Sequence, residues 1–212
     1  MGAKLGTIFA RAGHEVVFSY AHSDRKLQRL ARDAGHGARG GTPADAAENA
    51  DALLLAVHWS RVDDVLKQAG DLSGKVIVSC SLPMNADDSG LVIGHTSSGA
   101  EKLVRKARGA RVVAAFNTVP SEVLFDVFAR RHRRVRPSLV YYGDDRDAKR
   151  VAAQLIGDAG FDAFDAGPLR IARYAEPFAL LVAQLAYEGK AGPEVAYHFE
   201  WFGKRGKRTP RS

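Results

Sequence analysis

The strongest constraint on the fold is the segment 51–57, which is apolar at every position after its first residue. A strand without polar alternation has to be covered on both faces, as the strands of a parallel sheet are. Two more aliphatic runs follow at 75–79 and 111–116, and segments with helical periodicity separate the three runs. This alternation predicts an α/β fold with a doubly wound, mostly parallel, Rossmann-like sheet.

The beginning of the sequence has the pattern of the second half of a βαβ unit. Residues 2–13 have the period of an amphipathic helix, and residues 14–18 follow directly as a strand. In a dinucleotide-binding unit a strand and a G-x-G-x-x-G turn precede such a helix, and Gly2 fits the third glycine of that turn. We therefore expect the sequence to start one strand late, either at an internal methionine or in an impaired form. A helix followed by a strand is also common in α/β proteins that bind no nucleotide.

The rest of the chain continues the alternation, and we expect one domain over residues 1–202. The other expected strands are 38–41, 138–142 and 161–164, and the expected helices are 24–34, 43–49, 60–69, 100–106, 146–159, 178–187 and one that starts at Pro120. A long polar loop is expected at 83–98. The helix at 178–187 is the most apolar and is expected to contact a partner subunit. Residues 203–212 are basic and are expected to be disordered.

The positive charge is concentrated in two segments. The loop 130–136 and the tail 203–212 carry ten basic residues and no acid, and removing these ten charges from the formal net charge of +7 leaves −3. The folded body is therefore not a general nucleic-acid surface, and we expect no specific nucleic-acid partner. The loop 130–136 is either a solvated charge run or a contact for an anionic ligand.

Composition also bounds the location of the protein. The sequence has no apolar run of about 18 residues, so we expect no membrane span. Its start lacks the features of a secretory signal. The single cysteine, Cys80, excludes an internal disulfide and favours a reducing compartment. We expect a cytoplasmic protein.

Candidate binding residues lie directly after the expected strands, because ligands of such sheets bind outside the carboxyl ends of the strands. Four segments qualify: 19–23, 58–60, 80–85 and 117–120. All four are rich in small, hydroxylated or proline residues, which let the backbone approach a ligand. In any α/β protein, however, a segment of this kind is often only a polar loop.

The first of these segments indicates which dinucleotide would bind. An acid near this point would bind the ribose 2′-hydroxyl of NAD, whereas basic and hydroxyl groups accommodate the 2′-phosphate of NADP. The strand ends at Ser19, and His22, Ser23 and Arg25 are followed by Lys26, whereas Asp24 is the first acid. The pattern favours NADP, unless Arg25 and Lys26 only solvate a helix face.

No hydrolytic or metal-binding set of residues is evident. Cys80 follows a buried strand, where a thiol is more often core packing than a nucleophile. The seven histidines show no metal-ligand spacing. The pairs Asp87-Asp88 and Asp144-Asp145 are more simply turns or helix caps than cation sites. We therefore expect no catalytic acid–base residue and no metal, which suits a hydride transfer that depends on positioning and the exclusion of water.

Five motifs in order resemble one enzyme family. They are Ala12-Gly13-His14-Glu15-Val16-Val17, Leu55-Ala56-Val57-His58-Trp59, Ala115-Phe116-Asn117-Thr118-Val119-Pro120, Gly143-Asp144-Asp145 and Asp165-Ala166-Gly167-Pro168-Leu169. Over about residues 2–202 the chain is similar to the F420-dependent NADP oxidoreductases (NADPH:F420 reductases). The resemblance implies a homodimeric enzyme that moves a hydride between NADP(H) and the deazaflavin F420.

The resemblance also implies which residues form the site. It puts the nicotinamide near His58, Trp59, Val119 and Pro120 and the deazaflavin near Leu82 and Pro83. The full expected cofactor set is Gly2, Ser19, His22, Ser23, Arg25, Val57, His58, Trp59, Asn117, Val119 and Pro120, and the expected substrate set is Ser81, Leu82, Pro83 and Met84. If F420 is the substrate, the loop 130–136 could receive its phosphate and glutamate tail.

Two departures from the family leave other functions open. The first strand is missing, and Tyr20-Ala21 stand where such enzymes often have an arginine. One alternative is an NADPH-dependent reductase of a flavin, a metal chelate or a small imine, because fold does not dictate substrate. The other is a catalytically silent dinucleotide-binding protein.

Overall fold

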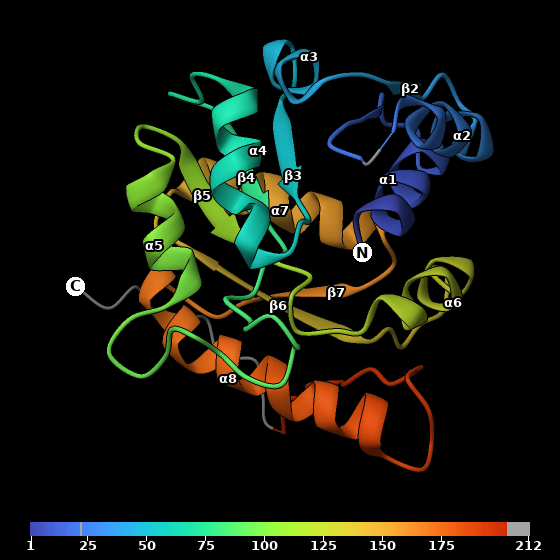
Figure 1. The fold of residues 1–212 in the computed structure, drawn as a ribbon. Helices are drawn as coiled ribbons and strands as arrows, with labels where there is room; N and C mark the ends of the chain where they lie inside the picture. The colour runs from blue at the N-terminus through green and yellow to red at the C-terminus, as the bar shows by residue number, and fades with distance from the viewer. Residues whose placement is uncertain (22, 203–212) are drawn as a thin grey trace.

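A computed structural model describes residues 1–21 and 23–202; His22 and residues 203–212 lie outside the described residues. The main sheet has the strand order β3-β4-β5-β6-β7 (Figure 1). Its strands are β3 (Ala52–Leu55), β4 (Val76–Ser79), β5 (Arg111–Ala114), β6 (Ser138–Gly143) and β7 (Asp162–Asp165). Every neighbouring pair is parallel except β5 and β6. The expected α/β fold with a mostly parallel sheet is therefore confirmed.

The expected single sheet is wrong in one respect, because the strands divide into two sheets. β1 (Val17–Phe18) pairs only with β2 (Arg39–Gly40), and the β1-β2 sheet is separate from the five-stranded one. In a doubly wound fold the first strand of the βαβ unit lies between the second strand and the fourth. The described residues contain no strand at that place. The two sheets consequently share no backbone ladder.

This division changes the environment of the most apolar segment. We expected 51–57 to be covered on both faces, but Ala52, Leu53 and Leu54 of β3 are only half-buried. All four residues of β4 are buried. The difference arises because β3 is an edge strand of its sheet, whereas β4 has a hydrogen-bonded neighbour on each side.

Eight α-helices alternate with these strands in the described part of the chain. They are α1 (Gly2–Arg11), α2 (Asp24–Ala34), α3 (Pro43–Glu48), α4 (Val62–Ala69), α5 (Gly99–Lys106), α6 (Leu124–Ala129), α7 (Arg146–Asp158) and α8 (Ala172–Ala183). Short 3₁₀ turns at Trp59–Arg61, Ser121–Val123 and Leu169–Ile171 precede α4, α6 and α8, and a π turn at Gln184–Glu188 follows α8. None of the helices within the described ranges is long and apolar enough to cross a membrane.

The helices begin where capping residues stand in the sequence. Ser23 accepts a hydrogen bond from the Lys26 amide (3.3 Å) at the start of α2. Thr42 and Asp45 form a reciprocal capping box before α3. Side-chain oxygens in these positions satisfy amides that have no partner inside the helix.

The last helix differs from the expectation. We placed it at 178–187, preceded by Pro177, but α8 starts at Ala172 and contains Pro177. A proline inside a helix removes one backbone hydrogen bond. The helix persists because Ala175 and Ala179 are buried against the rest of the fold on either side of the proline.

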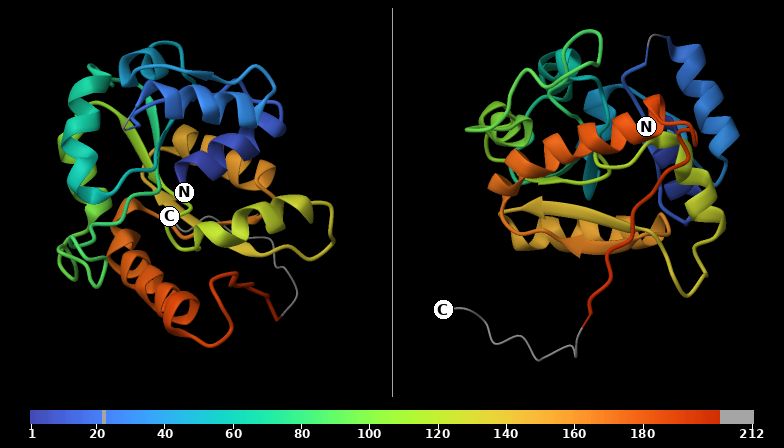
Figure 2. Two further views of the ribbon diagram at one scale, coloured as in Figure 1. Left: turned by 45° about the vertical axis from the view of Figure 1, so that its right-hand side comes forward. Right: turned by 90° about the horizontal axis from the view of Figure 1, so that it is seen from below.

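Helices cover both faces of the main sheet, as Figure 1 and Figure 2 show. One apolar cluster joins α1, α6 and α7 to β4 and β5 through residues such as Ile8, Leu124 and Ile156. A second cluster joins α4, α5 and α8 to the opposite face, through residues such as Val62 and Leu103. The segment after α8 returns to the start of β6, where the Ser138 amide donates to the Tyr197 carbonyl (2.8 Å).

Candidate functional site

The carboxyl ends of three parallel strands lie along one edge of the main sheet. Leu55 of β3 is in register with Ser79 of β4, which is in register with Ala114 of β5. The segments that follow these strands therefore start side by side. The segments after β3 and β4 are in direct contact, because the Ser81 hydroxyl donates to the Val57 carbonyl (2.7 Å).

The amino end of α1 lies at the same edge. A Cβ atom on Gly2 would be 3.3 Å from the Cβ of Ala56, the residue directly after β3, so only glycine allows this approach without a shift. No side chain caps α1, and within the described residues no hydrogen bond engages the amides of Gly2, Ala3 and Lys4. Free amides at a helix start form a ready anion-binding site.

The segment after β5 contains a strained residue and an unpaired acceptor. Phe116 has a φ of +64° and is fully buried, a backbone state that non-glycine residues rarely adopt. It directly precedes Asn117, whose amide nitrogen donates to the Tyr142 hydroxyl (2.8 Å). The Asn117 Oδ1 atom is buried and has no hydrogen-bond partner among the described residues. Buried polar atoms are rarely left without a hydrogen-bond partner. The Asn117 Oδ1 atom is therefore available to accept a hydrogen bond from a ligand.

The remaining residues of this segment are buried beneath the C-terminal segment. The Thr118 hydroxyl is 2.7 Å from the Tyr197 hydroxyl, and the Val140 amide donates to the same Tyr197 oxygen (3.2 Å). Val119 and Pro120 are also buried. Sequence reasoning missed Tyr197, because its role depends on the return of the chain after α8.

The segment after β3 is connected to the long loop. His58 Nδ1 is 2.8 Å from the Ser60 hydroxyl and accepts from the Ser60 amide, and His58 Nε2 is 3.2 Å from Asp88 Oδ1. This arrangement assigns the tautomer in which Nδ1 accepts and Nε2 donates to Asp88. His58 thereby holds the expected loop 83–98 against the strand end, and Trp59 beside it is half-buried.

The expected substrate residues follow β4 and run into that loop, which includes Pro83 and Met84. Ser81 and Pro83 are buried, whereas Leu82 and Met84 are half-buried. Pro83 packs against the start of α5 so closely that a Cβ on Gly99 would be 2.8 Å from its Cδ. The position of Pro83 thus depends on the position of α5.

A buried carboxyl group fixes the start of α5. Glu176 of α8 is 1% exposed, and it accepts hydrogen bonds from the amides of Gly99 (2.9 Å) and Ala100 (3.0 Å). Burial raises the pKa of the Glu176 carboxyl to about 7, although the two amide donors act in the opposite direction. Sequence reasoning gave no signal for this residue, because an isolated glutamate in a helix is usually exposed.

The expected 2′-phosphate residues lie on the smaller sheet. Ser19 is half-buried after β1, whereas Ser23 and Arg25 are exposed at the start of α2, and His22 lies outside the described residues. In the described part of the chain no hydrogen bond or ion pair connects Ser23 or Arg25 to the strand-end edge of the main sheet. Tyr20, which follows β1 at this smaller sheet, donates from its hydroxyl to Asp64 of α4.

The remaining candidates are the thiol of Cys80 and the paired aspartates, and burial or hydrogen bonds give each a structural role. Cys80 is buried, and burial raises the pKa of its thiol to about 12, which leaves it protonated and inert at neutral pH. Asp145 caps α7 through the Ala148 amide (2.7 Å), and Asp87 accepts from Ser89 in a turn. The described ranges contain no group of three His, Cys, Asp or Glu residues that could hold a metal.

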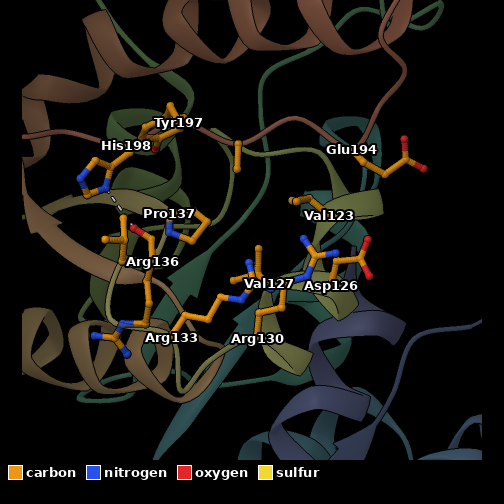
Figure 3. A pocket seen from close by; sticks show the side chains of 12 residues that line it. Val123, Asp126, Val127, Arg130, Arg133, Arg136, Pro137, Glu194, Tyr197 and His198 are labelled. Carbon is orange, nitrogen blue, oxygen red and sulfur yellow. Dashed lines mark hydrogen bonds between the residues drawn. The ribbon is translucent and has the colours of Figure 1, made fainter.

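A cavity of about 520 Å³ lies beside this edge (Figure 3). It is lined by α6, by the basic loop (residues 130–136) and by residues 194–198 after α8. It contains none of the expected cofactor or substrate residues. The cavity lies next to the strand ends and not at them, so it is distinct from the expected nicotinamide site.

Comparisons of the sequence agree with the resemblance drawn from its motifs. The model of the family "NADP oxidoreductase coenzyme F420-dependent" matches residues 1–83. The F420-dependent NADP reductase of Methanothermobacter thermautotrophicus is 28% identical over 198 residues, which cover 87% of this chain and 84% of that protein. The resemblance to F420-dependent NADP reductases is therefore confirmed over most of the chain.

Comparisons of the structure support the fold. A putative F420-dependent NADP reductase from Arthrobacter sp. FB24 superposes with a TM-score of 0.81 at 23% identity, covering 94% of this chain and 95% of that chain. A reductive aminase from Aspergillus terreus superposes with a TM-score of 0.62 at 17% identity, covering 87% of this chain and 57% of that chain. Both structures share the Rossmann-like architecture at identities that speak only for the fold.

Proposed function

From the chain's relationship to the F420-dependent NADP reductases, we propose that this protein is an oxidoreductase that transfers a hydride between NADP(H) and coenzyme F420. The observation that carries the proposal is the placement of the free amino end of α1 against Ala56, at the edge where β3, β4 and β5 end in register. Dinucleotides bind at this edge in doubly wound folds.

The residues at this edge fit a dinucleotide. The unpaired amides of Gly2, Ala3 and Lys4 can donate to a pyrophosphate, which the amino end of a helix also attracts electrostatically. The unpaired Asn117 Oδ1 can accept a hydrogen bond from the carboxamide of a nicotinamide. When bound, NADPH supplies the hydride, and the protein supplies binding and orientation.

The expected positions of the two ring systems are part of the same proposal. Val57, His58 and Trp59, together with Val119 and Pro120, would enclose the nicotinamide. Leu82, just before the 83–98 loop, and Met84, within it, are half-buried and would face the deazaflavin. The His58–Asp88 contact supports a loop that excludes water from this region.

Selection of NADP over NAD is proposed to rest on the smaller sheet. Arg25 and Ser23 are exposed at the start of α2, where a 2′-phosphate would meet both a charge and a helix start. Ser19 and His22 complete the proposed set. The fit with NADP is supported by the absence of an acid between Ser19 and Asp24 in the sequence.

We also propose a homodimer formed through α8. Tyr174, Leu181 and Leu185 are 68%, 56% and 55% exposed and share one face of α8 and the turn after it. An exposed apolar stripe on a long helix is typical of a protein–protein contact. A cytoplasmic location belongs to the same proposal and is supported by the single free cysteine.

The test is to mix the purified full chain with NADPH and F420 and to follow the loss of the visible absorbance of oxidised F420. Turnover with F420 and none with FMN would support the proposal. Turnover with FMN or a small imine instead would favour the alternative reductase. Calorimetric binding of NADP without any turnover would identify a silent dinucleotide-binding protein.

A further inference from the structure

The basic loop and the C-terminal segment form a cavity that is lined by apolar, positively charged and negatively charged side chains. Buried Val123, from the turn before α6, and Val127 of α6 form an apolar part of its lining, and the side chains of Arg130 and Arg133 extend into it (Figure 3). Glu194 and Tyr197 line it from the segment after α8. The lining thus offers aliphatic surface, guanidinium groups and hydrogen-bond acceptors within one hollow.

Two of the arginines in this lining have no intramolecular task. Arg136 is already engaged, because its Nε donates to Asp162 (2.9 Å). In the described part of the chain neither Arg130 nor Arg133 forms an ion pair or a side-chain hydrogen bond. Carboxylates are also present, since Asp126 and Glu194 line the cavity beside Arg130, Arg133 and Arg136, so the lining carries three guanidinium groups and two carboxylates.

The cavity is close to the proposed cofactor edge. Val123, which lines it, lies one helical turn after Pro120. Tyr197, which also lines it, contacts the Thr118 hydroxyl (2.7 Å). The Thr118–Tyr197 pair is therefore a wall that the strand-end edge and the cavity share.

We propose that this cavity binds the acidic side chain of the deazaflavin substrate, a phosphodiester that continues into a chain of glutamates. This inference rests on the proposed function. A glutamyl chain carries carboxylates for Arg130 and Arg133, and it also carries amide N–H groups that can donate to Asp126 or Glu194. A lining with both guanidinium and carboxylate groups therefore fits an acidic, peptide-like chain better than a bare anion. The methylene groups of the glutamates would contact Val123 and Val127.

The chain offers a matched control for the test. Arg133 lines the cavity, whereas the adjacent Arg134 belongs to the same loop but does not line it. Arg133→Gln and Arg134→Gln remove the same charge from neighbouring positions, so any general field effect is equal in both. The dissociation constant of F420 is measured by its fluorescence, without NADPH, for both variants, for R130Q/R133Q and for the unmodified chain. Circular dichroism and urea unfolding show whether each variant is folded.

The expected result is a loss of F420 affinity confined to the lining residues. R133Q should weaken F420 binding about three- to tenfold, R130Q/R133Q should weaken it more, and R134Q should change it less than about twofold. A deazaflavin that lacks the phosphate and glutamates should bind equally to all four proteins. Equal effects of R133Q and R134Q, or an equal effect on the tail-less deazaflavin, would overturn the proposal.

The same measurements separate this inference from the proposed function. If the unmodified chain reduces F420 and R130Q/R133Q binds it unchanged, the cavity proposal fails and the enzymatic one stands. If the unmodified chain binds neither F420 nor the tail-less deazaflavin, both fail. If it binds F420 in a manner that depends on Arg133 but does not reduce it, the cavity proposal stands alone.

Discussion

The buried Glu176 provides a sharp physical test of the structure. Its two carboxylate oxygens accept from the amides that begin α5, and the side chain is 1% exposed. Glu176→Gln keeps the shape but replaces one acceptor oxygen by an NH₂ group that faces an amide. A protonated Glu176 places an O–H group at the same position, so E176Q should have a free energy of unfolding within about 1 kcal/mol of that of the unmodified chain near pH 4.5, where the folded carboxyl is protonated.

The pH dependence of this effect follows from the pKa of the same carboxyl. Burial raises that pKa from its ordinary value of 4.5 to about 7. Between these values the folded chain holds a proton that the unfolded chain has released, so the free energy of unfolding falls as the pH rises through this window and levels off above it. The rise of the pKa from 4.5 to about 7 corresponds to about 3 kcal/mol. E176Q has no proton to release at this site and should lack this contribution.

The assay is urea denaturation of both proteins from pH 4.5 to 8. The two free energies of unfolding should be nearly equal near pH 4.5, and that of the unmodified chain should fall about 3 kcal/mol below that of E176Q toward pH 8. Since all other titrating groups are common to both proteins, their effects cancel. A difference that stays constant across this range would refute the assignment of Glu176 as a buried, titrating cap of α5.

Three further predictions follow from other contacts. Asn117→Ala removes the partner of the buried Tyr142 hydroxyl and should lower the free energy of unfolding by about 1–3 kcal/mol; N117A/Y142F should regain most of that stability in urea but not the NADP affinity measured by calorimetry. Asp88→Ala removes the contact between His58 and the 83–98 loop, so amide hydrogen exchange should accelerate in residues 85–90 while exchange in α4 stays unchanged. Equal exchange rates of residues 85–90 in the variant and in the unmodified chain would argue against the contact. Leu181→Asp places a charge in the exposed stripe of α8 and should convert a dimer to a monomer in sedimentation at an unchanged unfolding midpoint; an unmodified chain that is already monomeric would contradict the proposed dimer.

The sequence was sufficient to predict the elements whose signals are local. The helix at 24–34 has a serine cap and a glycine stop, and α2 has the bounds that these residues predict. The strand at 75–79 is apolar because it is buried on both faces, and β4 confirms that. Periodicity and capping are properties of neighbouring residues, so they can be recognised without knowledge of the fold.

The features that depend on distant contacts were not predictable from the sequence. Pro177 suggested a helix start, yet the packing of residues on both sides of it keeps α8 continuous. Tyr197 contacts Thr118 across 79 positions of the chain, and Glu176 contacts Gly99 across 77. The strained φ of Phe116 has no sequence signal either, since any residue type can precede an asparagine. Contacts of this kind join parts of the chain that are far apart in the sequence, so local patterns carry no signal for them.

The separation of β1 and β2 from the main sheet has a consequence for how the protein moves. Phe18 packs so tightly on Gly6 of α1 that a Cβ on Gly6 would lie 2.3 Å from the Phe18 ring, and Phe18 belongs to a small cluster of five buried residues. Residues 14–21 and 23–41 thus form a lobe that is attached to the body by this packing and by hydrogen bonds such as that from Tyr20 to Asp64, without a shared backbone ladder in the described residues. Such a lobe opens at a lower free energy than the whole molecule. If Arg25 binds the 2′-phosphate while the main sheet binds the nicotinamide, one nucleotide would contact both the lobe and the main sheet. Binding of the nucleotide would then reduce the motion of the lobe relative to the main sheet.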